Sequence, residues 1–185
     1  MGVILETPRL RLRPFVAGDF ADLYAFYRLP EVAQYLYWEA RDEAATAKAL
    51  EKKQGMTMWA KEGDTLLWGV VLPQEERLIG EVMLAWQSDI HRQGEVGFVF
   101  HPGYQGVGYA TEATSAILDW GFSMGGLHRI YGRCDTRNEG SYRLMERLGM
   151  RREAHFRHNE WFKGAWGDEY VYAILAEEWQ GRERS

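Results

Sequence analysis

The chain lacks the features that mark several large classes of protein. It contains a single cysteine, Cys134, so it cannot form an internal disulfide, which fits a reducing cytoplasm. No apolar run approaches the roughly 18 residues that span a membrane. The stretch from Met1 to Glu6 does not join a basic region to a long apolar segment, so no signal peptide is expected. We therefore expect a cytoplasmic protein with no membrane partner.

Positive charge is in the minority. The 22 lysines and arginines face 27 aspartates and glutamates, which gives a formal net charge of −5. Proteins that bind duplex nucleic acid usually present a basic face, so nucleic acid is not an expected partner. His155 and His158 stand three positions apart in an expected strand and would point to opposite faces. They would not chelate together, so no metal is expected.

Apolar residues are plentiful. They make up 46% of the 185 positions, which is enough to build the core of one domain. No repeat, low-complexity stretch or linker divides the chain, so residues 1–185 are expected to form a single domain. The periodicity predicts strands at 9–13, 65–72, 77–86, 94–100, 128–134, 153–162 and 168–175. It predicts helices at 19–28, 43–60, 110–124 and 138–149, and a short helix or turn at 31–38. This order predicts an α/β or α+β sheet with helices on both faces.

Four helix predictions are specific to named residues. Asp19 is placed to cap the helix at 19–28, and Asn138 is placed to cap a later one. The expected apolar stripe of the helix at 110–124 consists of Ala113, Ala116, Ile117, Trp120 and Met124. The expected apolar face of the helix after Asn138 consists of Leu144, Met145 and Leu148.

A glycine-rich turn follows the expected strand at 94–100 and leads into the helix at 110–124. Its sequence is Gln105-Gly106-Val107-Gly108-Tyr109-Ala110. Glycines let backbone N–H groups converge, and the first turn of a helix has unpaired N–H groups at the positive end of its dipole. The turn therefore predicts an anion site made from backbone, although a tight turn with ordinary packing has the same composition. Neither the Rossmann nor the P-loop spacing is present.

Several segments together resemble the GCN5-related N-acetyltransferases (GNAT superfamily). Gln105-x-x-Gly108-x-Ala110 resembles the family's pyrophosphate-binding signature, and Arg137-Asn138-x-x-Ser141 resembles its second conserved helix. Residues 78–82 resemble the third strand, and residues 148–150 resemble a further part of the second conserved helix. The opening at 7–13 and the ending at 177–179 resemble the branch that includes the ribosomal-protein N-terminal (RimJ/RimL-type) acetyltransferases. The resemblance covers nearly the whole chain.

The resemblance implies a fold, a co-substrate and a set of binding residues. The fold would be a mixed, mostly antiparallel sheet of about seven strands, in which the strands at 94–100 and 128–134 splay apart. Acetyl-CoA would be the co-substrate, with its pantetheine arm in that gap. The implied cofactor-binding residues are Phe98, Val99 and Phe100 along the arm, Gln105, Gly106, Val107, Gly108, Tyr109, Ala110 and Thr111 at the pyrophosphate, and Asn138 beside the arm.

Acetyl transfer needs a base for the amine and a donor for the departing thiolate. Glu95 is the candidate base. Strand alternation places its side chain on the same face as Gly97 and Val99, opposite the face of Val96, Phe98 and Phe100. A solvated carboxylate at the end of a strand is an equal alternative. Glu81 is the second candidate; it is expected to share a face with Ile79 and Met83, and an arginine could instead be its structural partner.

Ser141 is the candidate donor to the leaving thiolate. The tyrosine that many family members carry four residues later is replaced here by Met145, and Ser141 could alternatively cap backbone. Cys134 is expected to pack in the core rather than act as a nucleophile. Trp38, Trp86, Trp161 and Trp166 are expected near the acceptor side, as cleft lining or as packing.

Three functions fit these observations. The first is an N-acetyltransferase that acts on a small amine or a protein N-terminus, as a monomer or homodimer. The second is a non-catalytic acyl-CoA-binding or sensing module, and the third is another nucleotide-binding protein with the same loop. The sequence does not identify the acceptor, because substrate loops vary most within a fold.

Overall fold

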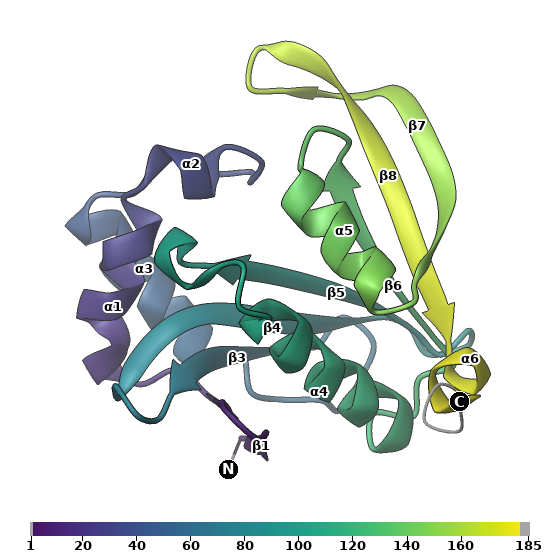
Figure 1. The fold of residues 1–185 in the computed structure, drawn as a ribbon, viewed down its shortest axis with the longest axis horizontal. Helices are drawn as coiled ribbons and strands as arrows, with labels where there is room; N and C mark the ends of the chain where they lie inside the picture. Colours follow the sequence, from purple (N-terminus) through teal and green to yellow (C-terminus); the bar gives the residue numbers. More distant parts are fainter. Residues whose placement is uncertain (1, 182–185) are drawn as a thin grey trace.

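The computed structural model describes residues 2–181 and folds them around one sheet of eight strands (Figure 1). The strands are β1 (Leu5–Glu6), β2 (Arg11–Arg13), β3 (Thr65–Leu72), β4 (Arg77–Ser88), β5 (Gln93–Phe100), β6 (Arg129–Asp135), β7 (Arg151–Phe162) and β8 (Ala165–Leu175). Their order in the sheet is β1-β2-β3-β4-β5-β6-β8-β7, and every neighbouring pair except β5 and β6 is antiparallel. The predicted fold class is confirmed, with the short β1 as an additional strand.

Helices cover both faces of the sheet, as predicted (Figure 1). They are η1 (Ala17–Asp19), α1 (Phe20–Tyr27), α2 (Pro30–Ala33), α3 (Glu43–Gln54), η2 (Pro102–Tyr104), α4 (Tyr109–Ser123), α5 (Glu139–Arg147) and α6 (Ala176–Gly181). Leu23 of α1 and Leu50 of α3 pack with Leu67 and Leu78 on one face. Among residues 2–181, no helix is both long and apolar enough to cross a membrane.

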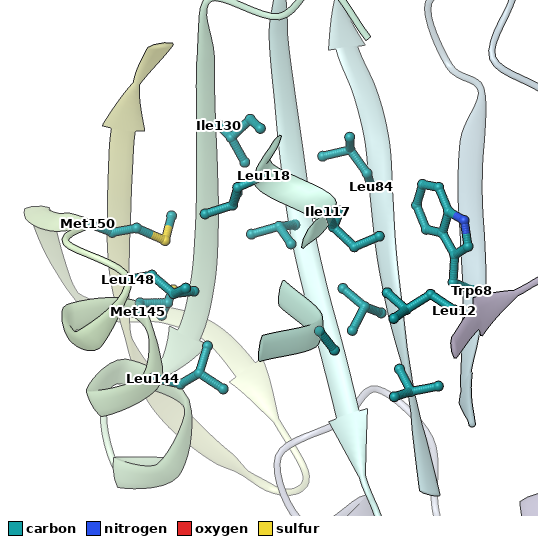
Figure 2. Close-up of a cluster of buried hydrophobic side chains, with 14 of the residues drawn as sticks. Leu12, Trp68, Leu84, Ile117, Leu118, Ile130, Leu144, Met145, Leu148 and Met150 are labelled. Carbon is teal, nitrogen blue, oxygen red and sulfur yellow. The ribbon is translucent and has the colours of Figure 1, made fainter. Parts of the chain in front are cut away.

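The larger apolar cluster lies between the sheet, α4 and α5 (Figure 2). Ile117 and Leu118 of α4 are fully buried beside Leu84 and Ile130 of the sheet. Full burial of such a side chain contributes roughly 1.5–3 kcal/mol. This packing fixes α4 on the sheet and so fixes the position of the glycine-rich turn at its start.

The buried face of α4 is rotated from the predicted stripe. Ala113 and Ile117 are buried as expected, but Met124 is 75% exposed. The remaining buried positions include Thr114 and Gly121, which do not count as apolar in a periodicity analysis. A Cβ on Gly121 would lie 2.8 Å from Ile130, so the helix and sheet approach most closely at a residue with no side chain.

Two predicted helix starts have different outcomes. Asp19 does not cap α1: its carboxylate accepts hydrogen bonds from Arg13 at 2.6 and 2.8 Å and from Val16 N at 2.8 Å. Asn138 does cap α5, because its side-chain oxygen accepts from Ser141 N at 3.2 Å. The predicted apolar face of α5 is buried, and α3 ends at Gln54 rather than at 60.

The sheet opens between β5 and β6. These parallel strands pair only at Gln93–Arg129, Gly94–Ile130 and Glu95–Tyr131. Beyond Glu95, β5 remains paired with β4 and β6 remains paired with β8, while the two strands diverge (Figure 1). The splay expected between 94–100 and 128–134 is therefore present.

Candidate active site

The turn between β5 and α4 has a shape that favours glycine at two positions. Gly106 and Gly108 have φ angles of 82° and 89°, in the left-handed region. Gly108 is the N-cap of α4, and the first hydrogen bond of the helix joins Glu112 N to Gly108 O at 3.0 Å. The N–H groups at the start of the first turn have no acceptor within the helix. Such a helix start is suited to bind an anion through its backbone.

An open cleft of about 1010 Å³ runs along this turn; we call it the donor cleft. Of the predicted cofactor-binding residues, those that line the donor cleft are Phe98, Val99, Phe100, Gln105, Gly106, Gly108, Tyr109, Ala110, Thr111 and Asn138. Val107 does not line it: the side chain is 54% exposed, and the carbonyl accepts a hydrogen bond from Arg9 Nη1 at 3.0 Å.

Arg9 and Thr7 hold the turn from the other end of the chain. Arg9 donates to both oxygens of Glu112, from its backbone N at 2.9 Å and from Nε at 2.6 Å. Its guanidinium also lies 4.7 Å from the centre of the Tyr109 ring, and Thr7 Oγ1 donates to Glu112 at 2.6 Å. Partial burial opposes ionisation of Glu112, but the hydrogen bonds from Thr7 and Arg9 outweigh it and lower the pKa. The sequence shows the likeness of this segment to the family but gives no sign of its bracing role.

A second cavity of about 750 Å³ lies beside the donor cleft; we call it the acceptor cavity. Its lining comes from the segment after α2, from α3 and α5, from β3 and β4, and from the diverging strands β5 and β6. The residues that line both cavities are Tyr35, Leu36, Phe98, Val99, Asn138 and Ser141. The two cavities therefore adjoin in the gap between β5 and α5, the position where a donor and an acceptor could meet.

Ser141 lies at this junction. It belongs to the first turn of α5, and its backbone N–H, rather than its side chain, makes the helix cap with Asn138. That arrangement leaves the capping alternative for the Ser141 side chain without support and keeps the hydroxyl in the lining of both cavities. The Asn138 oxygen is used in the cap, so any contact of Asn138 with a ligand would come from its amide nitrogen.

Cys134 lines the acceptor cavity but is only 9% exposed. Burial raises the pKa of its thiol to about 11, and the hydrogen bond with Ser141 only partly offsets that effect. The thiol is therefore protonated at neutral pH, and a thiol without a thiolate is a poor nucleophile. This environment agrees with the packing role that the sequence predicted.

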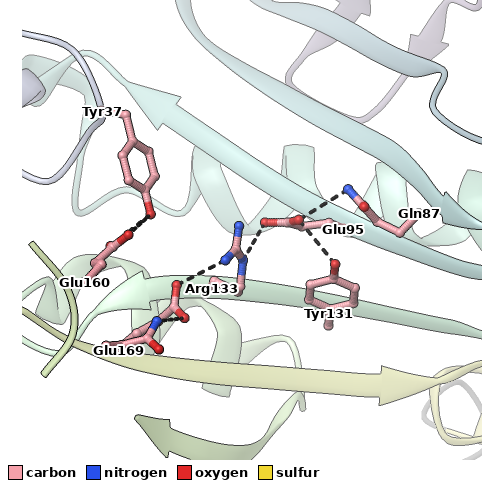
Figure 3. Close-up of polar contacts among 8 residues, drawn as sticks. Tyr37, Gln87, Glu95, Tyr131, Arg133, Glu160 and Glu169 are labelled. Carbon is pink, nitrogen blue, oxygen red and sulfur yellow. Dashed lines mark hydrogen bonds and ion pairs between the residues drawn. The ribbon is translucent and has the colours of Figure 1, made fainter. Parts of the chain in front are cut away.

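Glu95 points from β5 into a polar network beneath the acceptor cavity (Figure 3). Its Oε1 lies 3.1 Å from Arg133 Nε, and its Oε2 accepts from Tyr131 and Gln87 at 3.3 Å each. Arg133 also reaches Glu169 at 3.4 Å, so one guanidinium bridges two carboxylates. The predicted facing is confirmed: Val96, Phe98 and Phe100 pack in one core cluster and Val99 in the other.

Glu81 is the more enclosed of the two candidate bases. Its side chain is 8% exposed; Tyr27 Oη donates to it at 2.7 Å, and Lys53 Nζ lies 3.0 and 2.8 Å from its two oxygens. Its partner is thus a lysine rather than the arginine considered from the sequence. The carboxylate of Glu81 lines the acceptor cavity but is already held by two donors.

The prediction that Glu81 shares one face of the sheet with Ile79 and Met83 is right for Met83 and wrong for Ile79. Glu81 and Met83 face α1 and α3, but Ile79 packs in the cluster under α4. The cause is a register shift between Val70 and Val71, opposite Ile79, which adds one residue to β4 and reverses the alternation there.

The four tryptophans expected near the acceptor do not line either cavity. Trp86 stacks on Trp59 with ring centres 5.1 Å apart, and Trp38 packs on Tyr27 at 4.6 Å. Trp161 and Trp166 contact each other near the tip of the β7–β8 hairpin, where they are 63% and 57% exposed. Tyr35 and Tyr37 line the acceptor cavity together with Phe98, and the two tyrosines were missed.

His155 contacts a carboxylate of the neighbouring strand β8. This side chain lies 3.0 Å from Asp168 Oδ2, while His158 uses its backbone N–H to reach the same carboxylate. Within residues 2–181, no group of three or more His, Cys, Asp or Glu is arranged to hold a metal ion.

Comparisons with known proteins give one consistent family. The model of the acetyltransferase (GNAT) domain matches residues 9–151. An uncharacterised N-acetyltransferase of Bacillus subtilis, YnaD, is 38% identical over 95% of this chain and 98% of its own.

Solved structures agree with this match. A GNAT-family acetyltransferase from Bacillus anthracis is 35% identical, with a TM-score of 0.85, over 95% of this chain and all of that one. A spermidine N-acetyltransferase from Vibrio cholerae, solved with CoA and spermine, shares the fold at a TM-score of 0.78 and 24% identity, over 94% and 99% of the two chains.

Proposed function

The chain belongs to the GNAT acetyltransferase family, and we propose that it transfers the acetyl group of acetyl-CoA directly to a primary amine. The adjoining cavities carry this proposal. The donor cleft begins at the glycine-rich turn, the acceptor cavity ends at Glu95 and Glu81, and Ser141 lies in the lining that they share. Direct transfer needs such a junction, because both substrates must be present together.

Binding of the donor rests on backbone groups. The pyrophosphate is held by the N–H groups of residues 105–111, where the left-handed glycines leave room for its oxygens. The pantetheine arm lies between β5 and β6, where Phe98, Val99 and Phe100 have no strand partner on the open side. Alternate backbone groups of β5 face that side and can pair with the amides of the arm. CoA supplies the acetyl group as a thioester, and the protein holds that thioester in position for attack.

The acceptor amine attacks from the acceptor cavity. It must lose a proton on the way, and Glu95 accepts that proton directly or through an ordered water. An α-amine has a reference pKa of about 8, so a modest base is sufficient for it. Glu81 is the alternative base, but it is paired with Lys53, and Tyr27 and Lys53 both donate hydrogen bonds to its Oε1.

Ser141 assists departure of the CoA thiolate. Its hydroxyl donates a hydrogen bond to the sulfur as negative charge develops there. Backbone N–H groups on the open side of β5 are available for the carbonyl oxygen of the acetyl group in the same way. The buried, protonated thiol of Cys134 takes no part, so no acetyl-enzyme forms.

The acceptor is a small-molecule amine or a protein N-terminus. The V. cholerae relative was solved with the polyamine spermine, which supports a small amine in this fold. The likeness of residues 7–13 and 177–179 to the ribosomal-protein branch supports a protein N-terminus instead. Both are primary amines and require the same chemistry at the junction.

The experiment that tests the proposal measures thiol release. Purified protein is incubated with acetyl-CoA and a panel of primary amines, and CoA binding is measured separately by calorimetry. We expect CoA binding without any amine and thiol release only with an amine. Tight CoA binding with no turnover on any amine would support a sensing module instead, and absence of CoA binding would contradict the proposal.

Ser141→Ala tests the leaving-group assignment in the same assay. The substitution removes a hydroxyl but not the backbone N–H that makes the cap, so α5 should stay folded. We expect kcat to fall about tenfold or more, with little change in CoA affinity. Ser123→Ala is the matched control, because Ser123 is exposed and donates to Asp119 O far from either cavity. Equal kcat in both variants would remove Ser141 from the mechanism.

A further inference from the structure

One face of α3 forms a wall of the acceptor cavity. Residues at helical spacing along it contribute to the lining, namely Ala45, Lys48, Ala49, Lys52 and Lys53. Arg41, just before the helix, contributes as well and stacks over Trp38 at 4.5 Å. The lining as a whole contains five basic side chains and only two acidic ones, although the chain has a net charge of −5.

The cations in this lining are of two kinds. Lys53 is paired with Glu81, and Arg133 is paired with both Glu95 and Glu169. Arg41, Lys48 and Lys52 have no carboxylate within 4 Å among residues 2–181. Many other basic residues of the chain do have such a partner, including Arg9, Arg13 and Arg129. Positive charge without a partner is therefore gathered on the α3 side of the acceptor cavity.

Helix electrostatics explain only part of this arrangement. Lys52 and Lys53 lie in the last turn of α3, where a cation is favoured by the negative end of the helix dipole. Lys48 lies a full turn earlier and Arg41 precedes the helix, where a cation gains nothing from that dipole. Lys48 and Lys52 are exposed and solvated in the free protein, and a ligand with negative charge would meet them without a competing carboxylate.

The rest of the lining is largely apolar. Leu36, Met56, Leu67, Met83 and Met145 contribute apolar side chains to the same lining. A ligand in the cavity thus meets amine-activating groups, apolar side chains and a cationic wall. A polyamine would place its second cation against Lys48 and Lys52, where like charges repel.

Resting on the proposed function, we propose that the acceptor is a small amine that also carries a carboxylate or a phosphate. Its amine points to Glu95 and Ser141, and its anionic group binds Arg41, Lys48 and Lys52. The volume of about 750 Å³ is in the usual range for a small-molecule site and sets this class apart from a folded protein substrate. An α-amino acid with an apolar side chain fits these three requirements.

The test compares amines that differ only in the anionic group. Leucine is paired with leucinamide for the carboxylate, and 2-aminoethylphosphonate with ethanolamine for the phosphate-like group. Spermidine and a short peptide amide are included as the cationic and peptide alternatives. We expect kcat/KM, measured by thiol release, to be at least about tenfold higher for an anionic member than for its neutral partner. Equal values in both pairs, or a preference for spermidine or the peptide, would overturn the proposal.

Variants locate the preference on α3. Lys48→Ala with Lys52→Ala should lower the anionic-to-neutral ratio of kcat/KM about tenfold, and the helix should stay folded because alanine favours it. Lys48→Arg with Lys52→Arg should retain the ratio. Lys61→Ala is the matched control, because Lys61 is an exposed lysine that lines neither cavity. An unchanged ratio in the double alanine variant would overturn the assignment.

A binding measurement separates this inference from the proposed function. If no amine is turned over, the proposed function fails, and binding of N-acetylleucine and N-acetylleucinamide to the CoA complex decides the inference alone. Tighter binding of the acid, lost in the double alanine variant, would support it. Equal binding of both, or binding of neither, would overturn it.

Discussion

At the scale of single residues, the pairing of Glu95 decides how that carboxylate can work. Arg133 holds one oxygen, while the other accepts two longer hydrogen bonds from Tyr131 and Gln87 at 3.3 Å. Long hydrogen bonds are weak, so this second oxygen is the one that can exchange a partner for a water or an amine. Glu81 differs, because Tyr27 and Lys53 both donate to its Oε1, while its buried Oε2 accepts no hydrogen bond from the described residues and lies 2.8 Å from the Lys53 ammonium.

Glu95→Gln tests this distinction. Glutamine keeps the size of the side chain but cannot accept a proton, so we expect kcat/KM to fall by about 100-fold or more while CoA affinity changes little. Turnover is measured by thiol release and affinity by calorimetry. Glu81→Gln is the comparison: it leaves Lys53 without a carboxylate and should lower the melting temperature more than the turnover. Unchanged turnover in Glu95→Gln would remove Glu95 as the base.

Cys134 gives a second prediction at this scale. With a pKa of about 11, its thiol should react with iodoacetamide far more slowly at pH 8 than an ordinary cysteine with a pKa of about 8.5. The rate should rise as the pH approaches 11, because only then does the thiolate form. Mass spectrometry should find no acetylated Cys134 after incubation with acetyl-CoA, and Cys134→Ala should keep most of the turnover. An acetyl-cysteine would overturn direct transfer.

At the scale of elements, the sequence could predict features that arise from local patterns but not those that depend on long-range contacts. The strand, glycine turn and helix around 94–124 follow from periodicity and from glycine chemistry, and the cap at Asn138 follows from its side chain. The brace of Arg9 on Glu112 joins residues 103 positions apart, and no local pattern encodes it. The register shift at Val70 is likewise invisible, because it depends on how two strands pair.

The acceptor side shows the same limit. The cavity face of α3 has charged residues and alanines in the mixture typical of a solvated helix surface, so its position opposite β5 could not be read from composition. The four tryptophans were expected near the acceptor because of the segments they occupy. Their rings instead pack on one another or on Tyr27, since stacking and burial determine where an aromatic side chain points.

Gly108→Ala tests the role of the glycine turn. Gly108 has a φ of 89°, and an added Cβ would lie 3.3 Å from Arg9 Nη2. We expect the variant to lose about 1–2 kcal/mol of unfolding free energy and to bind CoA several-fold more weakly. Denaturant unfolding and calorimetry measure the two effects.

Gly63→Ala is the matched control for backbone strain. Gly63 has a φ of 92°, a Cβ there would meet nothing within 4 Å, and the residue lines neither cavity. It should lose similar stability with unchanged CoA affinity. Equal CoA affinity in the two variants would mean that the turn at Gly108 does not hold the cofactor.

At the scale of the whole molecule, the sheet is divided into two parts where β5 and β6 diverge. β1 to β5 form one part and β6 to β8 the other, with only three residue pairs of β5 and β6 between them. The cavities occupy the place where the pairing stops. A ligand that lies there contacts both parts of the sheet and binds only the folded chain.

CoA should therefore raise the melting temperature. A ligand at 100 times its dissociation constant adds about 2.7 kcal/mol to the folded state, which corresponds to several degrees for a chain of this length. Thermal unfolding followed by circular dichroism measures the shift. Dephospho-CoA and pantetheine provide graded controls, and pantetheine should give the smallest shift because it lacks the pyrophosphate. An equal shift with pantetheine would place the main binding energy outside the glycine turn.

The gap between β5 and β6 also affects how the protein behaves in concentrated solution. Each strand presents an edge of backbone donors and acceptors in the middle of a sheet, where most proteins leave none uncovered. Any extended peptide can dock on such an edge, including a segment from a neighbouring molecule in a concentrated solution. Protein stored without CoA should therefore aggregate sooner than protein stored with it. CoA would then serve as a stabilising additive during storage.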